Sequence, residues 1–469
     1  MTPKKVLLIE LNEITWTLID PMIERGELPT FARLKNEGAW AAPMSVDLPP
    51  QLDPWITWTT VYTGRRQSDH NVFFLQQPPE TIRAKRLWEL CAEQGLSVGV
   101  YGSLCSWPAR PVKGFYVPDT FAPDPQTHPA SLQPIQELNL TYTRSVRLPN
   151  DNDGAFFKAK LGARLVKLGL RPRTMARVAR QLARERVAPH ERWRRVALQP
   201  AVNFDFFRRL YRRHRPAFAT FHSNHVAHYM HTYWKAMQPE LFPQPATPEE
   251  VRHYGGAIRH GYRTADALLR GVLRLLDRDT VLVVASSMGQ QPYVSRLKRG
   301  KYIAQLRSLD RLLDILGVQG RARALSTMSD QFNIYPDTAQ TLQAVSRRLA
   351  AAYIDTPERP MFNLQALDNS LTVTLRHYDE VYEDSRCHFP HRGPQGAYRF
   401  EDLVYSTGLV KSGYHHPQGV LLLYGPGIRR GAHVAACDNL DLAPTLLTLL
   451  GLPVPTEMTG RVLLDECAA

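Results

Sequence analysis

Short runs of apolar and β-branched residues recur along this chain, and stretches with helical spacing follow most of them. Each run is long enough for one buried strand, and the alternation predicts an α/β fold around a mainly parallel sheet. The expected strands are Val6–Ile9, Ser97–Tyr101, Ala217–Phe221, Thr280–Ser286 and Val420–Tyr424. Ligands bind at the carboxyl ends of the strands in such sheets, so the polar residues at those ends are candidates for a functional site.

The length of 469 residues and the hydrophobic fraction of 43% allow one large domain with insertions. We expect residues 1–140, 217–289 and 400–469 to form the α/β core. Residues 141–216 are rich in arginine and poor in strand signals, which predicts a helical insertion. Residues 290–399 have strand patterns of their own, including LTVTLRHY, and predict a smaller mixed cap subdomain.

The formal net charge of +14 favours a negatively charged partner, and much of the excess lies in residues 141–216. This segment predicts either a basic lid that collects an anionic small molecule or ester, or a patch that lies on an anionic membrane. A solvated helical insertion is the plainer alternative. A nucleic-acid partner is disfavoured because no known reader motif accompanies the charge.

The five cysteines include no C-x-x-C pair, which fits a reducing compartment better than a disulfide scaffold. The N-terminus leads directly into the first strand pattern without the apolar region of a signal peptide. No stretch reaches the roughly 18 apolar residues of a spanning helix. We therefore expect a cytoplasmic protein, with peripheral membrane association as the alternative that the basic segment allows.

Several motifs follow one another in the order and spacing of a known protein group. They are VLLIELNEITW, PPQLDPWITWTTVYTG, FHSNHVAHYMHTYW, VLVVASSMG and SGYHHPQGVLLLYGPGI. Together they resemble the alkaline phosphatase superfamily, and in particular its type I phosphodiesterase/nucleotide pyrophosphatase branch. The resemblance implies a three-layer α/β/α sandwich with a large, mostly parallel central sheet and inserted cap regions.

In that family two divalent cations, often zinc, are bound by Asp and His, and a Thr or Ser attacks phosphorus or sulfur. Two of the family's ligand histidines match, at His228 and His415. The other family ligands fall on Asn12, Asn224, Ser287 and Met288, so these positions are altered. Neutral Asn brings no charge to an ion, and Ser and Met are poor replacements for Asp and His at zinc. A normal two-zinc centre is therefore not expected.

The nucleophile of the family is replaced as well. Counting back from Thr63 places either Pro54 or Asp53 at this position. Asp followed by Pro is also a favourable start for a helix, so a capping role for Asp53 competes with a catalytic one.

New carboxylates stand close to the altered ligands. A carboxylate such as Glu10 at a buried strand end is costly unless it is paired or bound to a cation. We expect Glu10, Asp53, His228 and His415 to bind one divalent ion, Zn²⁺ or Mn²⁺. Glu10 and Asp53 are also the expected catalytic residues, and Asn12, Asn224 and Ser287 are expected to bind substrate.

Histidine recurs at every third position from residue 222 to residue 231. Neighbours three apart share a helix face, but the set drifts around the helix, so all four cannot meet one ion. We interpret His222, His225 and His231 as ordinary hydrogen-bonded histidines and His228 as the functional member.

Two functions fit these patterns. The first is a remodelled phosphodiesterase-like or sulfatase-like enzyme that acts on an anionic ester. The second is a pseudoenzyme that binds an anionic ligand or partner without two-metal catalysis. The lost Asp ligands favour the second, whereas the new Glu, Asp and His residues at the same strand ends favour the first, which we prefer.

Overall fold

The computed structural model describes residues 4–49, 51–147, 164–295, 301–326, 330–367 and 369–467. The described residues form two compact units. The first unit comprises described residues of 1–143, 151–292 and 413–469. The second comprises those of 293–412 together with the end of helix α6 from Arg144.

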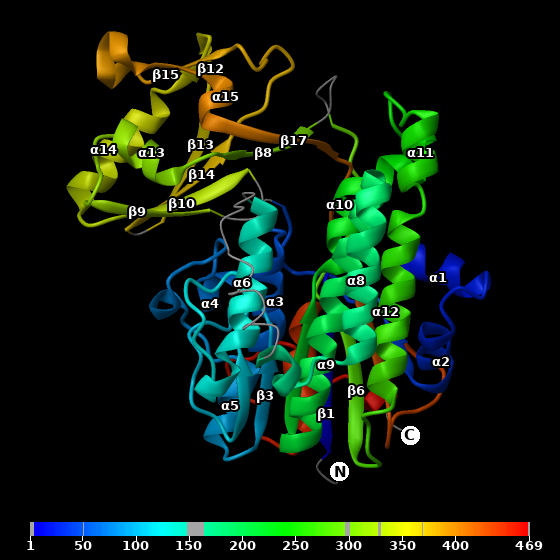
Figure 1. Cartoon of the computed structure of the whole chain (residues 1–469). Coiled ribbons are helices and arrows are strands. Elements are labelled where there is room, and N and C mark those ends of the chain that lie inside the picture. The colour runs from blue at the N-terminus through cyan, green and yellow to red at the C-terminus, as the bar shows by residue number, and fades with distance from the viewer. Residues whose placement is uncertain are drawn as a thin grey trace. The chain divides into compact units, whose positions relative to one another are not determined.

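An eight-stranded sheet lies at the centre of the first unit, in the order β20-β2-β19-β6-β1-β5-β3-β4 (Figure 1). Every neighbouring pair in it is parallel except those that involve β19, which runs antiparallel to β6 and β2. All five strands expected from the apolar runs are present. The strands are β20 (Ala432–Val434), β2 (Ala39–Ala41), β19 (Val420–Tyr424), β6 (Thr280–Ser286), β1 (Lys5–Leu11), β5 (Phe218–Ser223), β3 (Val98–Tyr101) and β4 (Gly114–Val117).

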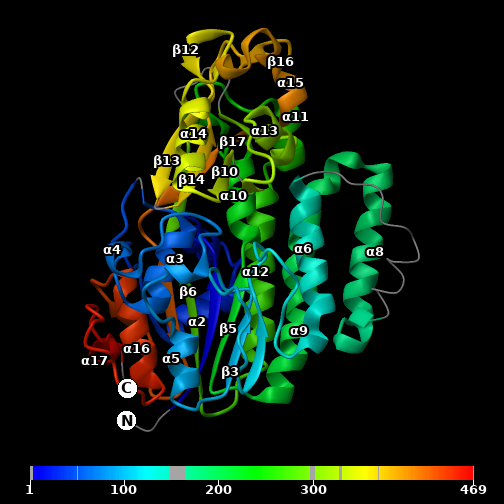
Figure 2. The same ribbon diagram turned by 90° about the vertical axis from the view of Figure 1, so that its left-hand side faces the viewer.

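Helices cover both faces of this sheet (Figure 2). One face packs against α1 (Trp16–Glu24), α2 (Pro29–Glu37), α9 (Leu198–His214), α10 (His225–Met237) and α12 (Ala257–Leu273). The opposite face packs against α3 (Pro54–Thr63), α5 (Leu87–Glu93), α16 (Leu442–Leu449) and α17 (Leu464–Cys467). The three-layer α/β/α sandwich is therefore confirmed.

Side chains of β1 alternate between these two layers. Leu7, Ile9 and Leu11 belong to the core beneath α9, α10 and α12, whereas Val6 and Leu8 belong to the core beneath α3 and α16. Because successive strand residues point to opposite faces, Glu10 points toward the α3 layer. This direction decides which partners Glu10 can reach.

The described residues of the arginine-rich segment from 164 onward belong to the first unit and are largely helical, and its residues 148–163 lie outside the described residues. It contains α8 (Pro172–Val187) and η3 (Pro189–Ala197) and leads into α9. Glu185 pairs with Arg195, and Glu191 pairs with Arg184 and Arg194. Among the exposed arginines of α8 are Arg173, Arg180 and Arg186, so the segment keeps a positive surface.

Short elements complete the first unit. They are α4 (Gln67–His70), η1 (Pro79–Thr81), η2 (Ala130–Leu132), the part of α6 (Gln133–Arg147) that ends at Thr143, η4 (Pro239–Leu241), α11 (Pro248–Tyr254), β7 (Gly289–Pro292), β18 (Gly413–His416) and η6 (Asn439–Asp441). Strands β7 and β18 pair antiparallel and place His415 opposite Gln290. Within the described chain, we find no helix with the length and apolar character needed to cross a membrane.

The second unit has its own core and contains the expected strand at LTVTLRHY as β14. One antiparallel sheet has the order β13-β14-β10-β9, another has the order β12-β11-β15-β16, and β17 pairs with β8. Its elements are β8 (Lys301–Leu306), α13 (Leu309–Ile315), β9 (Ala322–Ser326), β10 (Gln331–Pro336), α14 (Ala339–Ala350), β11 (Tyr353–Ile354), β12 (Thr356–Pro360), β13 (Phe362–Leu367), β14 (Ser370–Leu375), β15 (Arg386–His388), η5 (Pro390–Gly396), β16 (Ala397–Arg399), α15 (Phe400–Leu403) and β17 (Val404–Lys411).

Candidate functional site

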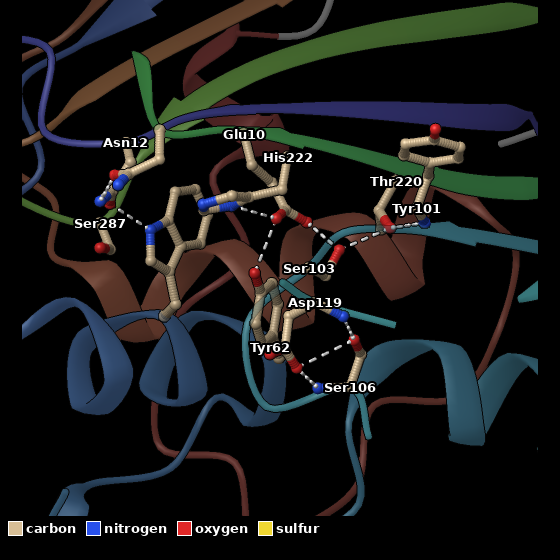
Figure 3. A network of polar contacts seen from close by, with 12 residues as sticks. Glu10, Asn12, Tyr62, Tyr101, Ser103, Ser106, Asp119, Thr220, His222 and Ser287 are labelled. Atoms are coloured by element: carbon tan, nitrogen blue, oxygen red, sulfur yellow. Dashed lines mark hydrogen bonds and ion pairs between the residues drawn. The ribbon is translucent and has the colours of Figure 1, made fainter. Parts of the chain in front are cut away.

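Polar residues gather where β1, β5 and β6 end. Asn12 follows β1, Asn224 follows β5, and Ser287 follows β6. Since these strands are parallel neighbours, their carboxyl ends meet at one edge of the sheet. Figure 3 shows Asn12 and Ser287 beside the network of Glu10 and His222 at this edge.

Asn12 and Asn224 are joined to each other. The Asn12 side-chain amide donates to Asn224 Oδ1 over 2.7 Å, and its oxygen accepts from the indole of Trp58, also over 2.7 Å. Two carboxylates at these positions would repel one another and would need a cation between them, whereas two amides offer a donor to an acceptor. The pair is therefore stable without a positive ion.

Ser287, at the third altered position, also makes a contact within the protein. Ser287 Oγ lies 2.8 Å from Thr57 Oγ1, and the neighbouring Met288 is fully buried. Thioether, hydroxyl and amide groups are weak ligands for zinc. The residues at the family's ligand positions therefore do not fit a two-metal centre.

Glu10 is fully buried and accepts three hydrogen bonds (Figure 3). Tyr62 donates to Oε2 over 2.7 Å, Ser103 donates to Oε1 over 2.8 Å, and His222 Nδ1 lies 2.9 Å from Oε2. Burial and the negative charge of Glu10 raise the pKa of Tyr62 well above its ordinary value, so Tyr62 remains a donor. This network supplies the pairing that a buried carboxylate requires.

His222 is the register partner of Glu10 on the adjacent strand. Its Nδ1 contacts the carboxylate, whereas its Nε2 is buried and has no hydrogen-bond partner among the described residues. Trp58 packs edge-on against the ring, with the centroids 5.7 Å apart. A buried ring nitrogen without a hydrogen-bond partner is costly. Because His222 Nε2 lies at the strand ends, a ligand or a water molecule bound there would supply the missing hydrogen bond.

Asp53 begins helix α3. Its Oδ1 accepts from the backbone N–H of Trp55 over 2.9 Å, and Pro54 occupies the first helical position. The alternative capping role thus has a direct contact in the structure. A catalytic or metal-binding role for Asp53 remains a prediction.

The histidines of the FHSNHVAHYMH motif diverge, as their spacing predicts. His225 lies between Ser223 Oγ, at 2.8 Å, and the carbonyl oxygen of Gly261, at 3.1 Å. His228 is on α10. Burial lowers the pKa of both rings to about 4, with the charge of His231 adding to the effect at His228. Both rings are therefore neutral near pH 7.

Among the described residues, Glu13, His231 and His415 form a group whose ligand atoms all lie within 4.8 Å of one another. His231 Nε2 is 3.1 Å from Glu13 Oε2, and His415 Nε2 is 3.7 Å from the same oxygen. Burial alone would raise the pKa of Glu13. Positive charge on His231 and His415, with hydrogen bonds from His231 and Gln290, outweighs burial and lowers that pKa to about 2.

Two of the residues expected to bind metal have contacts outside the network of Glu10. His415 lies beside Glu13 rather than in the network of Glu10, and Asp53 has its own contact on α3. Glu13 and His231 were not among the expected ligands. The sequence carried one signal for them, because Glu13 and His231 both stand close to altered family ligand positions and both are residue types that bind zinc.

The layered sheet and the polar strand ends define an alkaline phosphatase superfamily fold with an altered site. The chain belongs to the type I phosphodiesterase / nucleotide pyrophosphatase family, whose sequence profile matches residues 6–419.

Curated relatives match a short part of the chain. A stretch of 50 residues, 11% of this chain, is 52% identical to 2,3-bisphosphoglycerate-independent phosphoglycerate mutase of Cereibacter sphaeroides strain ATCC 17025. The enzyme of strain ATCC 17029 matches to the same extent. The matched stretch spans 9% of the length of each relative.

Solved structures match over nearly the whole chain. Murine ectonucleotide pyrophosphatase / phosphodiesterase 5 is 14% identical, with a TM-score of 0.45 over 99% of this chain and 100% of its own. An inactive variant of that protein in complex with AMP gives the same values. The human protein is 13% identical, also with a TM-score of 0.45 over 99% of this chain and 100% of its own.

Proposed function

We propose that this protein is an enzyme that hydrolyses an anionic phosphoester at a rebuilt site on the carboxyl edge of the sheet. Membership of the phosphodiesterase family supports phosphorus, rather than sulfur, as the reacting atom. The observation that carries the proposal is the buried pair of Glu10 and His222, whose imidazole Nε2 has no partner among the described residues.

This pair has the arrangement of a proton-transfer dyad. Glu10 orients the imidazole through Nδ1 and stabilises a positive charge on it, while Tyr62 and Ser103 fix the carboxylate. In hydrolysis, a bond forms between the water oxygen and phosphorus, and the bond to the leaving oxygen breaks. His222 Nε2 accepts the proton of water and returns it to the leaving oxygen.

Asn224 and Ser287 are proposed to bind the phosphoryl oxygens directly, and Asn12, whose two N–H groups donate to Asn224 and Glu13, is proposed to bind substrate by holding Asn224 in place. An amide or hydroxyl group can turn a donor toward a negatively charged oxygen, which a carboxylate cannot do. Asp53, at the start of α3, is the remaining proposed catalytic residue. The positive surface of α8 would raise the local concentration of such a substrate.

One divalent cation, Zn²⁺ or Mn²⁺, is the cofactor of this proposal. When bound, such an ion polarises a phosphoryl oxygen and stabilises the negative charge of the transition state.

A pseudoenzyme is the second candidate, and the contact between Asn12 and Asn224 favours it. The Asn12 amide donates to Asn224 Oδ1 where the family has ion-binding carboxylates, so the site edge can persist without catalysis. In that case the residues at the strand ends would bind an anionic ligand without turnover.

The proposal is tested with purified full-length protein and with aryl phosphate diesters, aryl phosphate monoesters and aryl sulfates. We expect diester turnover, with kcat reduced at least roughly 100-fold in His222→Gln and in Glu10→Gln because proton transfer is lost. His253→Gln is the matched control, since His253 belongs to α11 and its ring stacks on His190.

The outcomes separate the candidates. Turnover of diesters that depends on both residues supports the enzyme. A folded protein without turnover of any of the three ester classes, with phosphate esters that still bind, would establish the pseudoenzyme. Turnover that survives His222→Gln unchanged would remove the dyad from the mechanism.

A further inference from the structure

We infer that Glu13, His231 and His415 form a binding site for a single divalent transition-metal ion. Two of the three proposed ligands, Glu13 and His231, do not fall on the family's ligand positions, so this is a displaced site rather than a remnant of the two-metal centre. The binding of the ion is independent of turnover, and only its use in catalysis rests on the proposed function.

The orientation of both imidazole rings prepares them to bind an ion. His231 Nδ1 lies 2.9 Å from the carbonyl oxygen of Gly413, and His415 Nδ1 lies 2.7 Å from that of Leu52. A carbonyl oxygen only accepts, so each Nδ1 carries a proton, and a ring in its neutral form presents its lone pair at Nε2. Backbone carbonyls orient metal-binding histidines in the same way in known sites.

Both Nε2 atoms point to one oxygen, at distances that suit a shared ion. Zinc binds nitrogen and oxygen ligands at about 2.1 Å, so tetrahedral ligands lie about 3.4 Å apart. The distances from Glu13 Oε2 are 3.1 Å to His231 and 3.7 Å to His415. The second is longer than a hydrogen bond, and both lie close to the separation of two ligands on one ion.

The charges of these groups also favour a cation. Two imidazole lone pairs and one carboxylate converge, and all three repel one another unless positive charge lies between them. The charge can come from a proton on an imidazole or from a metal ion. A metal ion serves both rings at once, whereas a single proton on His231 serves only one of them.

Glu13 is fixed by its backbone and by two amides. Its φ of 61° is in the left-handed region, which is strained for a residue other than glycine. Asn12 Nδ2 donates to Oε1 over 3.0 Å, and Gln290 Nε2 donates to Oε2. The side chain is 2% exposed, so a strained, buried carboxylate is held where both imidazoles can share it.

The ligand set defines the class of ion. Two imidazoles and one carboxylate suit Zn²⁺ and comparable transition metals, and are a poor set for Mg²⁺ or Ca²⁺, which prefer oxygen ligands alone. Three protein ligands leave a fourth position open for water or substrate. The His231 side chain is 22% exposed, so the site can be reached from solvent.

The test is metal binding by the full-length protein in the absence of substrate. Metal content is first determined by elemental analysis, and the chelator-treated protein is then titrated with Zn²⁺ and with Mn²⁺ by calorimetry. We expect one tightly bound Zn²⁺ per chain and a rise in Tm on its addition. Glu13→Gln and His231→Gln should each weaken Zn²⁺ binding at least roughly 100-fold.

His228→Gln distinguishes this site from the ligand set that the family resemblance suggested. Zn²⁺ affinity that survives His228→Gln and is lost in His231→Gln supports the displaced site, and the reverse result overturns it. Glu13→Gln keeps the size of the side chain and one acceptor oxygen, and an unchanged circular dichroism spectrum shows that loss of binding is not loss of folding.

A wild-type protein that takes up neither ion, or a Glu13→Gln variant with full affinity, would also overturn the inference. Both results would assign the group as an ion pair between a protonated imidazole and Glu13. Metal binding without ester turnover would instead uphold the site and reject the proposed function, because binding is measured without substrate.

Discussion

Glu10 and His222 lie opposite each other on neighbouring parallel strands, and their side chains meet at 2.9 Å at the edge where the strands end. Neither residue type is needed to form the sheet, and a buried polar pair of this kind adds little net stability. We therefore propose that the pair serves binding or chemistry. Variants of the residues around the pair can separate a role in binding or chemistry from a role in folding.

Tyr62→Phe should lower the free energy of unfolding by about 2 kcal/mol, because the Glu10 carboxylate loses a buried charged hydrogen bond. Urea denaturation measures this change. Tyr353→Phe is the matched control, since the Tyr353 ring stacks on His388 and this contact does not use the hydroxyl. An equal loss in both variants would mean that the hydroxyl of Tyr62 does not stabilise Glu10.

Asn12→Asp should destabilise the protein by roughly 3 kcal/mol or more without added metal. The new oxygen would replace an amide that now donates to Asn224 and Glu13, and would face an acceptor in each. Thermal and urea unfolding measure the effect. Asn363→Asp on an exposed position of β13 provides the control, and a neutral effect of Asn12→Asp would show that the amide contacts do not hold the strand ends.

His70 should make stability fall as the pH is lowered. Its Nδ1 accepts from the N–H of Val72, and its Nε2 lies 3.0 Å from Thr60 Oγ1. Burial, with the charge of Arg65, lowers the pKa of His70 from 6.5 to about 3. The unfolded chain binds this proton first, so the contribution of His70 is present above pH 6.5 and declines from there toward pH 3.

The decline due to His70 amounts to about 2 kcal/mol between pH 7 and pH 5. Urea denaturation at a series of pH values measures it. His70→Gln should have a smaller slope over this range, because glutamine does not titrate. An identical slope in the variant would assign the acid sensitivity to other groups.

The arginines of α8 should speed the capture of an anionic substrate. Arg173→Gln with Arg180→Gln should lower kcat/KM at low salt severalfold, and the difference should vanish as salt screens the charges. The matched control is Arg274→Gln with Arg278→Gln, two exposed residues just before β6 at the opposite end of that strand. Salt-independent kinetics in the wild type would show that α8 has no steering role.

The α/β sandwich could be predicted from the sequence because buried strands and helices leave local patterns. The strands from Val6, Thr280 and Val420 are continuous apolar runs, and their order along the chain is that of the family. The N-cap of α3 could be predicted as well, because Asp followed by Pro is typical of the start of a helix.

Which residues meet at the site depends on the direction in which each side chain points, and a local sequence pattern does not specify that direction. Glu10 and Glu13 are three residues apart, yet Glu10 is on a strand and points toward Tyr62, whereas Glu13 follows the strand end with a positive φ. That turn brings Glu13 to His231 and His415, which come from α10 and β18. A tertiary arrangement of this kind could not be predicted from spacing along the chain.

The amide contact between Asn12 and Asn224 has a consequence for how the protein matures. A strand edge made of acidic ligands stays incomplete until the chain has captured its metal, which couples folding to ion supply. Here the two amides close that edge as soon as β1 and β5 are paired. The newly synthesised chain can therefore finish its central sheet without a metal ion between β1 and β5.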